Sequence, residues 1–86
     1  MNAFIFTIVL LNSQCNVVDT YHTDTVIIYS EQNILQIELP AVDPLVRSLD
    51  GIATIDIRTE KGYVQHLQRT DNKWIEVQTS SCQQRI

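Results

Sequence analysis

The chain is poor in the residues that interrupt regular structure, because its 86 residues include only two glycines and two prolines. We therefore expect few loops, or short ones. No stretch predicts disorder, since 44% of the residues are hydrophobic and 19% are charged. A chain of this length forms one small domain, residues 1–86, in which the polar residues 79–86 are expected to fray.

Basic residues are also scarce. Six lysines and arginines stand against ten acidic residues, which gives a formal net charge of −4. The six cations are scattered, whereas nucleic-acid binding needs clustered cations that neutralise phosphates, so direct nucleic-acid binding is not expected. The acidity predicts an ordinary solvated surface. The second interpretation is that the chain is an inhibitor, which occupies the basic surface of a partner.

Long hydrophobic runs are missing as well. The longest, Ala3–Leu11, has nine residues, about half of the ~20 that a membrane-spanning helix needs. No basic residue precedes it, and Gln14 stands before Cys15 where a lipoprotein signal has a small residue. We therefore predict a strand with both faces covered, one of them by a second copy of the chain, in a protein without membrane association and in the cytoplasm.

Cysteine is limited to Cys15 and Cys82, without a CxxC motif. In a chain that carries no convincing export signal, two cysteines predict free thiols rather than a bridge. A bridge between them would close most of the chain and would contribute roughly 4 kcal/mol by restricting the unfolded state.

The regular segments that remain are mainly strands. Residues 25–30 and 34–40 predict a hairpin, in which the second strand alternates apolar and polar side chains. A two-residue loop at 32–33 would turn Val26 and Ile28 towards the apolar face and is preferred, whereas a three-residue loop would turn the alternate residues there. The polar stretch that precedes the hairpin is interpreted as a loop with a short extended piece near Val17.

One helix is predicted near residues 44–49. Asp43 is a suitable N-cap, Pro44 suits the first helical position, and Gly51 suits the position after the end. The fold class is therefore α+β and mainly β: a largely antiparallel sheet of five or six strands with this one short helix.

The last third predicts a three-stranded meander, residues 52–59, 63–70 and 74–79. Two three-residue loops, 60–62 and 71–73, join the strands, with Gly62 in the left-handed conformation. These registers agree on one core face, which consists of Ala53, Ile55, Ile57, Leu67, Ile75 and Val77. A two-residue loop at 71–72 would instead bring the last two beside polar residues of the middle strand.

The opposite face of the meander carries the candidate binding residues, Asp56, Arg58, His66, Trp74 and Glu76. His66 would lie across from Asp56 and diagonal to Glu76, and a carboxylate can orient an imidazole as general-base sites require. A solvated face with favourable cross-strand charge pairs is the simplest interpretation, a binding patch the second, and an acid–base site the third. If exposed, Trp74 would anchor an interface; after a slip of register it would belong to the core.

Catalytic and cofactor motifs are missing: no GxGxxG, GxxxxGK[ST], GxSxG or HExxH occurs. His22 and Asp24 share one face of an extended segment but are too few for a metal site. We therefore predict no cofactor, no metal and no enzymatic activity.

The leading function is a non-enzymatic protein-interaction module, as a homodimer through Ala3–Leu11 or as an inhibitor or adaptor of a larger partner. The alternatives are a small-ligand or enzymatic domain that uses the Asp56, His66 and Glu76 face, and an exported accessory protein.

Overall fold

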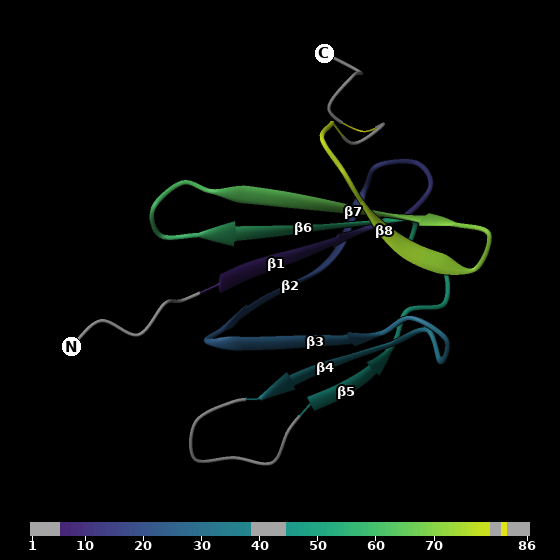
Figure 1. Cartoon of the computed structure of the whole chain (residues 1–86), viewed down its shortest axis with the longest axis horizontal. Coiled ribbons are helices and arrows are strands. Elements are labelled where there is room, and N and C mark those ends of the chain that lie inside the picture. The colour runs from purple at the N-terminus through teal and green to yellow at the C-terminus, as the bar shows by residue number, and fades with distance from the viewer. Residues whose placement is uncertain (1–5, 39–44, 80–81, 83–86) are drawn as a thin grey trace.

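Two antiparallel sheets form the domain (Figure 1). The computed structural model describes residues 6–38, 45–79 and 82. Its strands are β1 (Phe6–Leu11), β2 (Val17–Thr23), β3 (Thr25–Tyr29), β4 (Ile34–Glu38), β5 (Leu45–Ser48), β6 (Thr54–Thr59), β7 (Val64–Thr70) and β8 (Lys73–Val77). The first sheet has the order β2-β1-β6-β7-β8 and the second the order β3-β4-β5. The mainly β, antiparallel architecture is thus confirmed, but the described residues form eight strands in two sheets rather than one sheet of five or six strands. They include no helix, neither the short one that was predicted nor one long and apolar enough to cross a bilayer.

The core lies between the two sheets. Both sheets and the connection between β5 and β6 contribute to it: the buried cluster consists of Ile8, Leu10, Leu35, Ile37, Leu49, Ile52, Ile55 and Ile57. The strands β1, β4 and β6 each contribute two alternate residues, as the twofold period of a strand requires. Removing these side chains from water is the main stabilising contribution to so small a domain.

The segment predicted as a helix is a strand in its described part. Residues 45–48 form β5, which pairs with β4 and leaves Val46 exposed and Leu45 partly buried; Asp43 and Pro44 lie outside the described residues. A six-residue helix is marginal by itself, whereas an extended segment can satisfy the hydrogen-bonding edge of β4. Gly51 does have the expected positive φ, 83°, in a turn that follows Leu49.

The first strand is an interior strand. Residues 6–11 of the predicted Ala3–Leu11 strand form β1, which is hydrogen-bonded to β2 on one side and to β6 on the other. Its backbone therefore has no free edge for a second copy of the chain. The segment interpreted as a loop between Asn12 and Asp24 includes the seven-residue strand β2, whose mostly exposed side chains hide the usual apolar signal.

The β3–β4 hairpin keeps the predicted faces with a longer loop. Val26 pairs with Ile37 and Ile28 with Leu35, so the apolar side chains share the inner face. The loop has four residues, 30–33, rather than two. A change of two residues shifts the register without reversing the faces.

The predicted strand register is confirmed for one hairpin of the meander and wrong for the other. The β6–β7 register is confirmed, including Asp56 opposite His66 and Gly62 at a φ of 86°. The β7–β8 register is wrong, because the turn is the two-residue loop Asp71-Asn72, with φ values of 52° and 65°. Two successive left-handed residues make a type I′ turn, which Asp and Asn tolerate. Every side chain of β8 is therefore on the opposite face from the one predicted.

Candidate functional site

The main polar feature of the described residues is a hydrogen-bonded Asp–His pair on the outer face of the five-stranded sheet. Asp56 on β6 and His66 on β7 are directly opposite each other, and Asp56 Oδ1 lies 2.8 Å from His66 Nδ1. Both residues are buried, with 6% and 7% of their surface exposed. The strand register thus brings the two residues together as the alternation of the sequence predicts.

The pair belongs to a row of residues that crosses the whole sheet. From β2 to β8 the row consists of Thr20, Val9, Asp56, His66 and Val77, each paired with the next. The carboxylate and the imidazole therefore have apolar side chains on both sides. Such neighbours reduce the access of water and strengthen the hydrogen bond between the two side chains.

Of the other three predicted site residues, only Arg58 shares the face of this pair. Arg58 is on the same face and exposed, opposite Val64 of β7. Glu76 is exposed and pairs with Leu67, whose side chain packs against the core, so it lies on the inner-face side of the sheet. The expected constellation is thus reduced to Asp56, Arg58 and His66.

Trp74 has a structural position rather than the predicted place on the outer face. Its ring packs against the core. Its Nε1–H donates to Asn33 Oδ1 at 3.0 Å, and its backbone N–H donates to Ser30 Oγ at 3.2 Å. Both acceptors lie in the β3–β4 loop, so Trp74 connects the two sheets.

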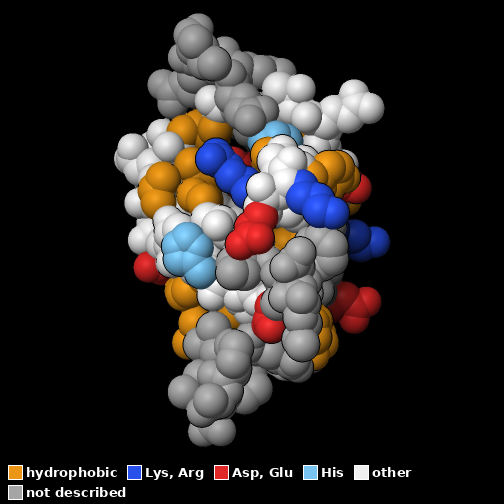
Figure 2. Space-filling model, turned by 90° about the vertical axis from the view of Figure 1, so that its left-hand side faces the viewer, with side chains coloured by type: hydrophobic (Ala, Val, Ile, Leu, Met, Phe, Trp, Pro, Cys, Tyr) orange, Lys and Arg blue, Asp and Glu red, His pale blue; other side chains and the backbone are white. Residues whose placement is uncertain are grey.

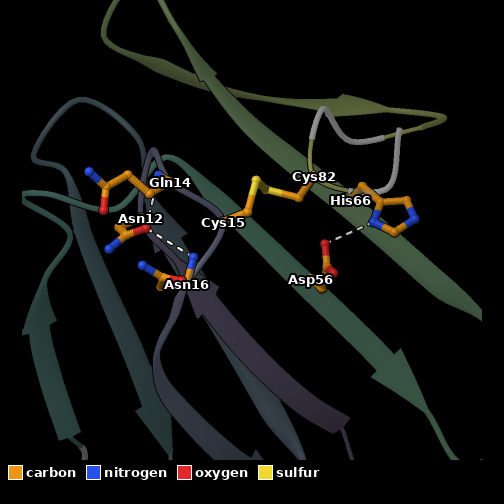
Figure 3. The surroundings of a disulfide bond; sticks show 7 residues. All are labelled: Asn12, Gln14, Cys15, Asn16, Asp56, His66 and Cys82. Carbon is orange, nitrogen blue, oxygen red and sulfur yellow. Dashed lines mark hydrogen bonds and ion pairs between the residues drawn. A yellow bond between two sulfur atoms is a disulfide. The ribbon is translucent and has the colours of Figure 1, made fainter. Parts of the chain in front are cut away.

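A disulfide joins Cys15 to Cys82, which corrects the expectation of free thiols. Cys15 lies between β1 and β2, and Cys82 follows β8, so the bridge connects opposite ends of the five-stranded sheet. The Asp56–His66 pair lies in its surroundings, and the second ring nitrogen of His66 points away from the sulfur atoms (Figure 3). The two cysteines are 67 positions apart, and no spacing motif reveals such a pairing in a sequence.

The loop that carries Cys15 is fixed by its own hydrogen bonds. Asn12 Oδ1 accepts from the backbone N–H groups of Gln14, at 2.9 Å, and Asn16, at 3.0 Å. These bonds surround Cys15, which has a left-handed backbone with a φ of 65°. A non-glycine residue in this conformation needs the support of its surroundings, which the loop and the disulfide provide.

The chemistry available to the pair is limited in the described part of the chain. Asp56 holds the Nδ1 edge of the imidazole, and no described residue hydrogen-bonds its Nε2. A general base must come within hydrogen-bonding reach of the proton that it abstracts, and the described side chains supply no such donor at this nitrogen. Among the described residues no group of three metal-ligating side chains occurs either, and His22 Nδ1 lies 3.2 Å from Thr7 Oγ1.

Two open hollows differ in their relation to the pair. The larger, ≈ 500 Å³, is lined by Tyr63, Val64, Glu76, Val77 and Gln78. Val77 is the cross-strand neighbour of His66, so this hollow lies next to the pair, although neither Asp56 nor His66 lines it. The other, ≈ 270 Å³, lies between the sheets and is lined by Phe6, Val26, Ile28, Ile57, Gln65 and Leu67.

The outer face of the three-stranded sheet is of a different kind. The strand register places eight residues on it: Thr25, Ile27, Tyr29, Ile34, Gln36, Glu38, Val46 and Ser48. Glu38, at the end of β4 opposite Thr25, is the one charged residue among these positions. Of the other seven, four are hydrophobic; Tyr29 is 41% and Val46 58% exposed. We call these seven residues, without Glu38, the uncharged face. On the side of the molecule drawn in Figure 2, by contrast, basic and acidic side chains alternate with hydrophobic ones.

Comparisons with known proteins add no relative. No protein-family model matches the chain, and no similar protein was found among the curated proteins or the solved structures.

Proposed function

We propose that the chain is a non-enzymatic protein-interaction domain that works in an oxidising compartment. The observation that carries this proposal is the uncharged face on β3, β4 and β5. Exposed hydrophobic side chains that lie together on one face of a sheet are typical of surfaces that bind another protein.

The size of this face limits the kind of contact. Three strands about 4.8 Å apart and about five residues long, at about 3.3 Å per residue, present roughly 14 by 17 Å. This is well below the roughly 800 Å² per partner of a stable complex, so the face supports a small or transient contact or one part of a larger interface. An inhibitor or adaptor of a larger protein fits this description.

The disulfide supports the oxidising compartment. Bridges of this kind persist in secreted and periplasmic proteins and are rare where glutathione and thioredoxin keep thiols reduced. The Cys15–Cys82 bond thus favours the exported interpretation over the cytoplasmic one. Alkylation of the freshly isolated native protein, followed by mass spectrometry, tests it: we expect unmodified, bridged cysteines, and alkylation of both would contradict the proposal.

The enzymatic alternative has less support. It needs Asp56, His66 and Glu76 on one face, and Glu76 shares the side of the sheet that carries Leu67. We therefore do not propose a catalytic role.

Two lysine substitutions test the interaction. Val46→Lys places a charge in the uncharged face, whereas Thr70→Lys places the same charge at an exposed position of β7. A partner that the parent chain captures from its native source should be lost by Val46→Lys and kept by Thr70→Lys. Equal capture by both variants would contradict the proposed face, provided that circular dichroism shows both folded.

A further inference from the structure

The smaller of the two sheets ends at β3. The larger sheet has the order β2-β1-β6-β7-β8, whereas β3, β4 and β5 form the smaller sheet that packs on it (Figure 1). β3 is hydrogen-bonded to β4 on one side, and no strand of the described residues pairs with its other side, which we call the free edge. Backbone N–H and C=O groups at such an edge can pair with another extended chain.

A hollow of ≈ 270 Å³ lies beside the free edge. On the larger sheet it is lined by residues of β1, β6 and β7, and on the smaller sheet by Val26 and Ile28 of β3. Since no residue of β4 or β5 lines it, the hollow lies at the edge of β3 rather than under the middle of the smaller sheet. It is therefore the place that inward side chains of a fourth strand would fill.

We propose that the free edge binds an extended segment of a partner protein, which adds a fourth strand to the smaller sheet and places a hydrophobic side chain in the hollow. In this mode of recognition, main-chain hydrogen bonds provide affinity and pockets for alternate side chains provide specificity. Successive residues of a strand point to opposite faces. The neighbours of the inserted residue would therefore lie beside the uncharged face.

The composition of β3 supports this role. Its residues Thr25–Tyr29 are all β-branched or aromatic, and none is charged. The other edge strands each carry charges: β2 has Asp19, β5 has Arg47, and β8 has Lys73 and Glu76. Charged side chains on an edge strand protect it against pairing with another chain, and β3 lacks this protection.

The lining of the hollow indicates which side chain of the partner fits. Gln65 supplies the one polar side chain among the described lining residues; the others, which are hydrophobic, are Phe6, Val26, Ile28, Ile57 and Leu67. A charged side chain would lose its hydration there without gaining a partner of opposite charge. We therefore expect an aliphatic or aromatic residue in the hollow.

A single extended segment fits this place, whereas a second copy of the chain does not. Two copies paired antiparallel through β3 would be related by a twofold axis, with the inner faces of both smaller sheets on the same side. Each larger sheet extends past the free edge, because Gln65 and Leu67 of β7 line the hollow there. The larger sheets of the two copies would then occupy the same space. A segment without a second layer avoids this overlap.

This inference goes beyond the proposed function, because it concerns the edge and the inner side of β3 rather than the uncharged outer face. The two can therefore fail separately. Val46→Lys, which lies on the outer face of β5, should leave binding at the free edge within twofold of the parent chain.

Peptide titration followed by NMR tests the proposal. The probe is the capped peptide Lys-Thr-Leu-Thr-Leu-Thr-Lys, whose two leucines share one face of an extended chain. Binding should shift the backbone amide signals of β3 and the methyl signals of Val26, Ile28 and Leu67. The same peptide with glutamine in place of both leucines should bind at least tenfold more weakly. A version with an N-methylated backbone cannot donate main-chain hydrogen bonds and should also bind at least tenfold more weakly.

Two glutamines of β7 provide matched variants. Gln65→Phe fills the hollow, whereas Gln68→Phe places the same ring on the outer face, where residue 68 is paired with Thr54. The affinity for the leucine peptide should fall at least tenfold with Gln65→Phe and stay within twofold with Gln68→Phe. Circular dichroism checks that both variants are folded, and the shifts in the parent chain test the proposal without them.

Each outcome decides the proposal. Saturable shifts at β3 and around the hollow, with weaker binding of both control peptides, support it. No shift in β3 would overturn it, as would equal binding of the N-methylated peptide, since main-chain pairing would then not hold the segment. Shifts confined to Ile34 and Val46 would place the peptide on the uncharged face and would overturn it as well. A concentration-dependent dimer of the chain alone, with shifts in β3, would also overturn it, because a second copy would then occupy the edge.

Discussion

The two outer faces of the sandwich differ in how far their side chains are paired within the molecule or left exposed. On the five-stranded sheet, polar side chains are paired within the chain: Asp56 binds His66, and a covalent bond lies beside them. On the three-stranded sheet, the uncharged face exposes Tyr29 and Val46, and none of its described side chains is charged. The first face buries its polar pair inside the molecule, whereas the second leaves hydrophobic side chains exposed.

This comparison makes the disulfide the largest single contribution to stability outside the core. Replacing Cys15 and Cys82 by serine should lower the free energy of unfolding by about 4 kcal/mol, because the unfolded chain loses a loop constraint. Urea unfolding of the variant and of the parent chain measures the difference. A loss below about 1 kcal/mol would mean that the bond does not constrain the unfolded chain as this model of disulfides requires.

The buried Asp56–His66 pair should give the next largest effect. Asp56→Ala leaves His66 buried without its hydrogen-bond partner, and removing the partner of a buried polar group costs about 2 kcal/mol. Arg58→Ala on the same face, where the side chain is exposed, should change stability by less than about 0.5 kcal/mol. Similar losses for both variants in denaturant unfolding would remove the distinction between the pair and its exposed neighbour.

Substitutions in β8 should have smaller effects on stability, and their order tests the register of this strand. Trp74→Phe should cost about 1 kcal/mol, because the hydrogen bond to Asn33 is lost while most of the ring contacts remain. Ile75→Thr should stay within about 0.5 kcal/mol, since this residue faces solvent rather than the core. Thermal unfolding of the two variants compares their losses of stability. A larger loss for Ile75→Thr than for Trp74→Phe would support the register in which Ile75 is the buried residue.

The smallest effect on stability is expected on the uncharged face. Val46→Lys should change the free energy of unfolding by no more than about 0.5 kcal/mol, because Val46 is 58% exposed and has little contact to lose. Calorimetry measures this change. A loss of 2 kcal/mol would show that Val46 supports the fold, and the face would then be a covered surface rather than a free one.

Some of this architecture follows from the sequence by local rules. The β6–β7 hairpin could be predicted with its register, because Gly62 marks the left-handed turn position and the strands on either side alternate. The same alternation placed Asp56 opposite His66. Predictions of this kind succeed where a single residue type decides the turn.

Other elements depend on which of two alternative conformations or pairings is favoured in the folded chain, and the local sequence does not indicate the outcome. Asp71 and Asn72 both adopt left-handed conformations, and the pair lacks the glycine that usually marks such a turn. Residues 45–48 carry helix-capping neighbours, yet the open edge of β4 decides their conformation. The pairing of Cys15 with Cys82 depends on the order of strands that lie between them, which only the folded topology reveals.

The central claim is that the domain binds its partner through the uncharged face, and methyl NMR tests it most directly. Titration of the labelled chain with its purified native partner should shift the methyl signals of Ile27, Ile34 and Val46, which share that face. The signals of Val9 and Val77, in the row beside the Asp56–His66 pair, should stay in place. Shifts confined to Val9 and Val77 would contradict the account and would place the interface on the five-stranded sheet.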